Sequence, residues 1–270
     1  MRNTRIAAQG LVLLGCGKMG SAMLTGWLES GLPADKVWVI EPVPSLWLRG
    51  TGVHINEDLP DAPAVVLVAV KPQMMGDALP AIAALGGGET VFVSIAAGTS
   101  LARYEQTFGA DTPIVRAMPN TPAAIGCGIT AICANDAGQG ALDEAAALLS
   151  AVGDVVVLES EAQMDAVTGV SGSGPAYVFH MIETLAAGGE AQGLSPELAM
   201  QLAKATVAGA GALAMQSDDD PTQLRINVTS PNGTTQAALE VLMNEQSGFP
   251  VLLPRAVAAA TARSRELSRD

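Results

Sequence analysis

The sequence predicts an α/β fold in which an N-terminal parallel-sheet domain is followed by an all-helical C-terminal domain. Short apolar runs alternate with helical patterns over residues 1–158, which is the order typical of parallel sheets. The run at residues 64–70 is uninterrupted, as expected for a strand covered on both faces. Residues 159–270 contain long helical patterns and no convincing strand. We therefore expect one domain at residues 1–158 and a second at residues 159–270.

The spacing of apolar residues predicts the individual elements. Strands are expected at residues 11–14, 37–40, 64–70, 91–95, 114–115, 129–133 and 155–158. After the first strand, Met23, Leu24 and Trp27 fall on one helical face, and Gly31 ends that helix. Later helices are expected at residues 165–189 with an interruption at 171–175, and at 196–216, 235–244 and 254–267. Residues 218–221 are expected to form a linker.

The helix expected at residues 196–216 contains two interior glycines, Gly209 and Gly211. An interior glycine costs about 1 kcal/mol relative to alanine. We expect close contact between helices to offset this cost, and an Ala- and Gly-rich helical domain suits a subunit interface.

Composition excludes several classes of protein. The net charge is −13, so the chain lacks the basic face that a nucleic-acid-binding protein needs. The three cysteines, Cys16, Cys127 and Cys133, lack the spacing of a metal site. With only two histidines, a zinc site or a Ser-His-Asp triad has little to draw on. Hydride transfer needs neither, because the cofactor carries the chemistry.

The N-terminus also bears on location. No apolar run approaches the roughly 20 residues that span a bilayer, so we expect no membrane partner. Residues 11–16, preceded by Arg2 and Arg5, resemble a short lipoprotein signal, but Gln9 and Gly10 interrupt the apolar stretch. A strand followed by a phosphate loop explains the same residues better, and it predicts a cytoplasmic protein.

A glycine-rich loop follows the first expected strand. Gly15, Cys16, Gly17, Lys18, Met19 and Gly20 match the pattern G-x-G-x-x-G. In a Rossmann-type domain these glycines allow a tight turn, close approach of the pyrophosphate and packing of helix on strand. The strand before the loop and the helix after it favour this interpretation over a merely structural glycine turn. The predicted cofactor is therefore NADPH or NADH.

An acidic residue, Glu41, follows the second expected strand, 21 residues after Gly20. A carboxylate there can accept hydrogen bonds from the adenosine ribose, which favours NAD, and it would repel a 2′-phosphate. The alternative is that Glu41 points to solvent beside Pro42, so both cofactors stay open.

Four further motifs lie downstream in the chain: AVKPQ at residues 69–73, MPNTP at 118–122, SGSGPAY at 171–177 and VTSPNGTT at 228–235. With these motifs and the glycine loop, the sequence resembles pyrroline-5-carboxylate reductase over nearly its whole length, in the same order and spacing. The resemblance implies reduction of Δ1-pyrroline-5-carboxylate to L-proline by NADPH or NADH, the last step of proline biosynthesis. It also implies a helical dimerisation domain and a homodimer or higher homo-oligomer, with the substrate site at the interface.

The resemblance implies contacts to the cofactor at several positions besides the glycine loop. The expected residues are Ala69, Val70, Lys71 and Pro72, then Ala96, Ala97 and Gly98, and also Asn56, Asn120, Glu161 and Asn227. The two runs end proposed strands, where open parallel sheets bind ligands. The alternatives are ordinary strand-end turns and, for the isolated polar residues, plain surface positions.

The resemblance places substrate at the loop before the helix that begins near residue 235. Ser230, Gly233, Thr234 and Thr235 are the expected binding residues, and the Thr235 hydroxyl is expected to bond the ring nitrogen as the catalytic residue. Free N–H groups in a first helical turn suit a carboxylate. An ordinary capped helix start explains the same residues without a ligand. Asn232 replaces a glycine usual in the family, and asparagine tolerates positive φ.

Two other functions fit the same architecture. A reductase of this fold can act on a 2-hydroxy acid or another cyclic imine, because fold alone does not fix the substrate. A regulatory dinucleotide-binding relative without catalysis is the other alternative, with Asn232 in its favour and the intact Ser230 and Thr235 against it.

Overall fold

The structure is a computed structural model that describes residues 4–268. The chain divides into two compact units. The first runs up to Gly172 and includes residues from Ala260 onward, and the second is Ser173–Ala259. The sequence placed the division at residue 158, where the strands end. That domain boundary stays a prediction, and residues just after 158 still pack in the first unit: Met164 is buried in its core, and Asp165 Oδ1 accepts a 2.7 Å bond from Ser264 Oγ.

The first unit is built on one eight-stranded sheet in the order β3-β2-β1-β4-β5-β6-β7-β8. The first six strands have the order of a doubly wound dinucleotide-binding fold. The strands are β1 (Leu11–Leu14), β2 (Val37–Ile40), β3 (His54–Ile55), β4 (Val65–Val68), β5 (Val91–Ser94), β6 (Ile114–Met118), β7 (Gly128–Ala134) and β8 (Gly153–Val157).

The sheet is mostly parallel, as predicted, but β7 runs antiparallel to β6. Residues 119–127, which connect the two strands, contain only the short helix η4 (Thr121–Ile125). A parallel crossover needs about a dozen residues or more, so this connection returns the chain in the opposite direction. The sequence also missed β3, since two residues show no alternation. It ended β6 at Val115, whereas the strand continues to Met118.

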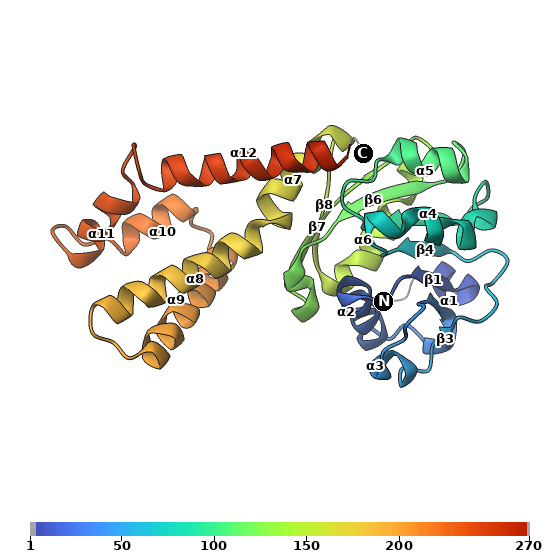
Figure 1. The fold of residues 1–270 in the computed structure, drawn as a ribbon, viewed down its shortest axis with the longest axis horizontal. Helices are drawn as coiled ribbons and strands as arrows, with labels where there is room; N and C mark the ends of the chain where they lie inside the picture. The colour runs from blue at the N-terminus through green and yellow to red at the C-terminus, as the bar shows by residue number, and fades with distance from the viewer. Residues whose placement is uncertain (1–3, 269–270) are drawn as a thin grey trace. The chain divides into compact units, whose positions relative to one another are not determined.

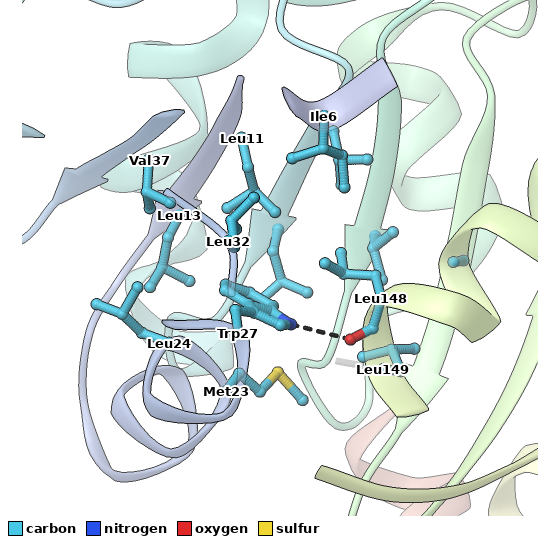
Figure 2. Close-up of a cluster of buried hydrophobic side chains, with 14 of the residues drawn as sticks. Ile6, Leu11, Leu13, Met23, Leu24, Trp27, Leu32, Val37, Leu148 and Leu149 are labelled. Carbon is cyan, nitrogen blue, oxygen red and sulfur yellow. Dashed lines mark hydrogen bonds between the residues drawn. The ribbon is translucent and has the colours of Figure 1, made fainter. Parts of the chain in front are cut away.

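The two faces of the sheet bury alternate residues of the central strands. One face packs against α2 (Lys18–Glu29) and α6 (Leu142–Leu149). Buried side chains on this face include Leu11, Leu13, Val37, Val39, Val65, Leu67, Met23, Leu24, Trp27, Leu148 and Leu149. Figure 2 shows the indole N–H of Trp27 pointing at the carbonyl oxygen of Leu148, with 2.9 Å between the two atoms. The only polar atom of this large side chain is thereby satisfied.

The opposite face packs against α4 (Met75–Ala78), η3 (Leu79–Leu85) and α5 (Leu101–Phe108), which lie in the blue-green to green part of Figure 1. Its buried residues include Val12, Leu14, Val66, Val68, Phe92, Ile82, Tyr104 and Phe108. The remaining helices of the unit are α1 (Thr4–Gln9), α3 (Leu46–Arg49), α7 (Met164–Val167) and the π-helical turn Thr168–Gly172. Burial on both faces explains the uninterrupted apolar runs in the sequence.

The second unit is entirely helical in the described residues. Its helices are α8 (Gly174–Ala191), α9 (Pro196–Gln216), α10 (Pro221–Asn227), α11 (Thr234–Leu242) and α12 (Phe249–Leu267), the last of which extends into the first unit. The prediction of a helix at residues 196–216 is confirmed, with Ser195 Oγ capping its first turn. The expected linker at 218–221 is wrong at Pro221, where Asp220 caps α10. The last helix begins at Phe249 and carries Pro254 inside it.

Helix α9 departs from expectation in two ways. Among residues 4–268 it alone is long and apolar enough to cross a membrane, with a mean hydropathy of 1.3 in its most apolar stretch. The expectation that no segment reaches this length is therefore wrong, although length and composition do not distinguish a membrane span from an apolar helix that packs against protein. A Cβ atom added at Gly209 or Gly211 would meet nothing within 4 Å. The expected close helix contact is absent there within the described chain.

The Trp27 hydrogen bond predicts a stability effect. Trp27→Phe keeps an aromatic ring in the core but leaves the Leu148 carbonyl without its donor. Such a loss costs about 1–3 kcal/mol of unfolding free energy, which denaturant unfolding measures. The control is Trp47→Phe, because Trp47 is 43% exposed. Equal stability losses in the two variants would contradict the role assigned to the bond.

Candidate dinucleotide site and substrate loop

Four loops of the first unit come together at one edge of the sheet. Strand β1 is in parallel register with β2 and with β4, so that Leu14 pairs with Ile40 and with Val68. Val68 pairs in turn with Ser94 of β5. The residues that follow these four strand ends therefore line a single edge, and they are the residues that the sequence predicted to bind cofactor. Open parallel sheets bind ligands at this edge.

The three glycines of the loop have three different surroundings. Gly15 has φ of 90°, and a Cβ there would lie 2.8 Å from Val70 Cγ1, so the turn requires glycine. A Cβ at Gly20 would collide with the carbonyl oxygen of Gly15. A Cβ at Gly17 would meet no atom within 4 Å. The open space beside Gly17 is what a pyrophosphate needs in order to approach the backbone.

The N-terminus of α2 supplies donors at this open space. Gly17 is its N-cap residue and makes no side-chain capping bond. The first backbone N–H groups of a helix have no partner within the helix, so those of Lys18, Met19 and Gly20 are available to an anion. Gly17 and Lys18 are exposed, whereas Gly15 and Gly20 are buried. The loop therefore fits a dinucleotide pyrophosphate on geometry and on electrostatics.

Cys16 differs from its neighbours in the loop. Its N–H donates to Glu41 Oε2 at 2.9 Å, so this amide already has a partner. Burial, with a smaller contribution from the Glu41 carboxylate, raises the pKa of the Cys16 thiol to about 11. The thiol stays protonated at neutral pH and is not a nucleophile.

Asn56 lies beside Glu41 because β3 pairs with β2. Its amide makes two bonds to the Glu41 backbone: Oδ1 accepts from the N–H, and Nδ2 donates to the carbonyl, both at 2.9 Å. Asn56 has φ of 54°, a conformation that asparagine tolerates. Asn56, which was predicted to contact the cofactor, thus also holds the backbone of Glu41 in place.

The loops after β4 and β5 hold the other predicted runs. Ala69 and Val70 are half-buried beside the glycine loop, and Lys71 and Pro72 are exposed. After β5, Ala96 is buried, Ala97 is exposed, and Gly98 has φ of 76°. The structure therefore brings both runs to the sheet edge where the glycine loop lies.

A buried cation that the sequence analysis missed lies on β6, paired with Ser94 at the end of β5. Arg116 of β6 is 6% exposed, and its Nη1 donates to Glu161 Oε1 at 2.6 Å. The same oxygen accepts from the Leu101 N–H, the first residue of α5, at 2.9 Å. Glu161 thus ties β6 to the start of α5, just after the run 96–98. The available signal was Arg116 itself, a single charge inside an apolar strand.

Two asparagines that were predicted to contact the cofactor form hydrogen bonds with other groups of the protein. Asn120 is 9% exposed, donates to Ser171 O at 3.2 Å and accepts from the Ile129 N–H at 3.0 Å. Asn227 ends α10 in the second unit and donates to Asp219 Oδ2 at 3.1 Å. Contact of either side chain with cofactor stays a prediction.

The predicted substrate loop, with Ser230, leads into α11 in the second unit. Gly233 is the N-cap of this helix and makes no side-chain capping bond, so the N–H groups of Thr234 and Thr235 are available. Thr234 is exposed and Thr235 is half-buried. Asn232 has φ of 58°, a positive value that asparagine tolerates. The loop therefore keeps its turn without a glycine at that position.

The contrast between Gly17 and Gly20 predicts two separable effects. Gly17→Ala leaves the unfolding temperature unchanged, because its Cβ meets no protein atom, yet it blocks the pyrophosphate and weakens dinucleotide binding by about tenfold or more. Gly20→Ala lowers the unfolding temperature because its Cβ meets the Gly15 carbonyl. Calorimetric titration and thermal unfolding measure the two effects. Full affinity in Gly17→Ala would rule out the proposed approach of the pyrophosphate.

Comparison with known proteins agrees with this geometry. Residues 161–267 match the family described as pyrroline-5-carboxylate reductase dimerisation, and residues 10–98 match the one described as NADP oxidoreductase, coenzyme F420-dependent. The chain is 39% identical over 267 residues to pyrroline-5-carboxylate reductase of Pseudomonas aeruginosa, covering 96% of this chain and 97% of that protein.

Solved structures give the same result. The reductase of Coxiella burnetii has a TM-score of 0.90 at 32% identity and covers 96% of this chain and 98% of its own. The Plasmodium falciparum enzyme with NADP bound has a TM-score of 0.82 at 28% identity, with coverage of 96% and 98%. Similarity of this degree over almost the full length means that the chain belongs to the pyrroline-5-carboxylate reductase family.

Proposed function

We propose that this protein reduces Δ1-pyrroline-5-carboxylate to L-proline with NADPH or NADH, the last step of proline biosynthesis. The observation that carries the proposal is the pairing of an intact pyrophosphate loop with a full-length family match. The bound dinucleotide supplies the hydride, which goes to C5 of the imine ring. The loops at the sheet edge hold the dinucleotide, and the amides of Lys18, Met19 and Gly20 receive its pyrophosphate.

Residues at the start of α11 bind the substrate. The N–H groups of Thr234 and Thr235 receive the substrate carboxylate, assisted by the positive end of the helix dipole. Ser230 and Gly233 shape the turn around it, and the Thr235 hydroxyl bonds the ring nitrogen. A C=N carbon is most electrophilic when its nitrogen is protonated, and solvent supplies that proton. Residues of this chain therefore act by positioning rather than as strong acids.

The direct test follows the loss of absorbance at 340 nm with pyrroline-5-carboxylate and each reduced cofactor in turn. The proposal requires turnover with this imine well above that with other cyclic imines and with keto acids. Turnover with a keto acid alone would make the protein a different reductase. Dinucleotide binding without oxidation by any imine would make it a regulatory relative.

A substitution at Thr235 tests its role. Thr235→Ala removes the hydroxyl proposed to bond the ring nitrogen, so we expect kcat/KM to fall by about tenfold or more. The Kd for NADH stays unchanged, because the dinucleotide loop is in the other unit. Thr235→Ser keeps the hydroxyl and retains most of the activity. Unchanged turnover in Thr235→Ala would remove Thr235 from the mechanism.

We propose further that the protein is at least a homodimer through its helical unit, and that it works in the cytoplasm. In the described part of this unit the buried apolar residues are Ala186, Ala199 and Ala203. Large apolar side chains remain exposed on α8 and α9, among them Phe179, Met181, Leu185, Leu198, Leu202, Leu213 and Met215. Three alanines bury too little area to stabilise such a unit alone, and large exposed apolar patches mark interaction surfaces.

Charge placed on this surface tests the interface. Leu202 is 48% exposed, so Leu202→Asp is tolerated within one subunit but places a carboxylate in the proposed interface. We expect this variant to shift from dimer to monomer in light scattering. Ile125→Asp is the control, since Ile125 is 78% exposed in the first unit. A fully active wild-type monomer at working concentration would contradict the proposal.

A further inference from the structure

The carboxylate of Glu41 is fixed at the end of β2 by two backbone donors. Oε2 accepts from the Cys16 N–H at 2.9 Å, and Oε1 accepts from the Val43 N–H at 3.1 Å. The first bond ties the carboxylate to the glycine loop, and the second ties it to its own turn. With one donor on each oxygen, the group cannot rotate away without breaking a charge-assisted bond.

The Glu41 backbone is held just as firmly. The Asn56 side chain bonds both its N–H and its carbonyl oxygen at 2.9 Å. Asn56 is itself placed by the bond from its N–H to Val39 O, also at 2.9 Å. The position of the negative charge is therefore set before any ligand arrives.

The fixed carboxylate retains capacity for a neutral ribose. An ionised carboxylate has about four lone-pair sites, and the two backbone bonds use two of them. The acid at the end of the second strand is the group that receives ribose hydroxyls in dinucleotide-binding folds. A 2′-phosphate at the same place would bring a second negative charge against a carboxylate that cannot withdraw.

The backbone of residues 42–44, directly after Glu41, offers no free N–H to a phosphate. Pro42 and Pro44 have no N–H, and the Val43 N–H is bonded to Glu41. Ser45 Oγ accepts from the Leu48 N–H at 3.1 Å as a helix cap, so its own O–H is the one hydroxyl donor of the segment 42–49. The cation of this segment is Arg49, whose Nε donates to Pro44 O at 3.3 Å.

We propose that Glu41 is a specificity-determining residue that makes this protein select NADH over NADPH. The proposal rests on the proposed function only in taking a nicotinamide dinucleotide as the cofactor. It separates this chain from its Plasmodium falciparum relative, whose structure has NADP bound.

The test is calorimetric titration of the full-length protein with NAD⁺ and with NADP⁺, which measures binding without turnover. We expect NAD⁺ to bind at least about tenfold more tightly, the scale of one close like-charge contact near a protein surface. Glu41→Gln keeps the side-chain shape and removes the charge, so the preference falls by about tenfold, mainly through tighter NADP⁺ binding. Glu57→Gln is the matched control: Glu57 is 60% exposed, bonds His54, and its loss leaves the preference unchanged.

Other outcomes overturn the proposal. Equal affinities in the wild type, or tighter NADP⁺ binding, would do so even if Glu41→Gln fails to fold. An unchanged preference in Glu41→Gln would do so as well. If the wild type prefers NADP⁺ and Arg49→Gln loses that preference, then Arg49 binds the 2′-phosphate and determines the specificity instead of Glu41. Selective NAD⁺ binding without reduction of pyrroline-5-carboxylate would refute the proposed function and leave the selectivity standing.

Discussion

The parallel register of β1 with its neighbours positions both the core of the first unit and the loops that follow its strands. Because Leu14 pairs with both Ile40 and Val68, and Val68 pairs with Ser94, four strands end level with one another. The polar backbone of the following loops is thereby gathered at one edge. Shifting one strand would move its whole set of apolar side chains as well, so the buried core and the cofactor edge are fixed by the same register.

The two units differ in the size of the side chains that they bury. The first unit buries large side chains on both faces of its sheet, from Trp27 on one face to Tyr104 on the other. Its loops can therefore hold fixed positions, as the braced Glu41 does. The helical unit buries only small side chains and leaves large ones exposed. Large exposed apolar patches mark interaction surfaces, which agrees with the match of residues 161–267 to a dimerisation family.

Much of the fold and site could be predicted from the sequence because local sequence patterns indicate the strands, the pyrophosphate loop and the helices. Central strands show as apolar runs, the pyrophosphate loop shows as three spaced glycines, and α9 shows as a capped, uninterrupted helical pattern. The antiparallel β7 could not be predicted in this way, since its direction depends on the length and course of the preceding connection. The start of the last helix was also misplaced, because Pro254 suggested a beginning where the helix in fact continues through it.

The interactions that the sequence did not reveal join residues far apart in the chain. Arg116 bonds Glu161, 45 residues away in the chain, and the Cys16 amide bonds the Glu41 carboxylate, 25 residues away. Spacing alone does not identify such pairs, because each depends on how separate loops are brought together. A single charged residue inside an apolar strand, such as Arg116, indicates a buried ion pair whose partner lies elsewhere in the chain.

We propose that one chain carries two backbone amide sites, one for a dinucleotide pyrophosphate and one for an amino-acid carboxylate. A crystal structure of the protein soaked with reduced cofactor and proline examines both amide sites in one experiment. We expect pyrophosphate oxygens on the amides that begin α2 and the proline carboxylate on those that begin α11. Both ligands bound elsewhere, with these amides facing solvent, would contradict the proposal.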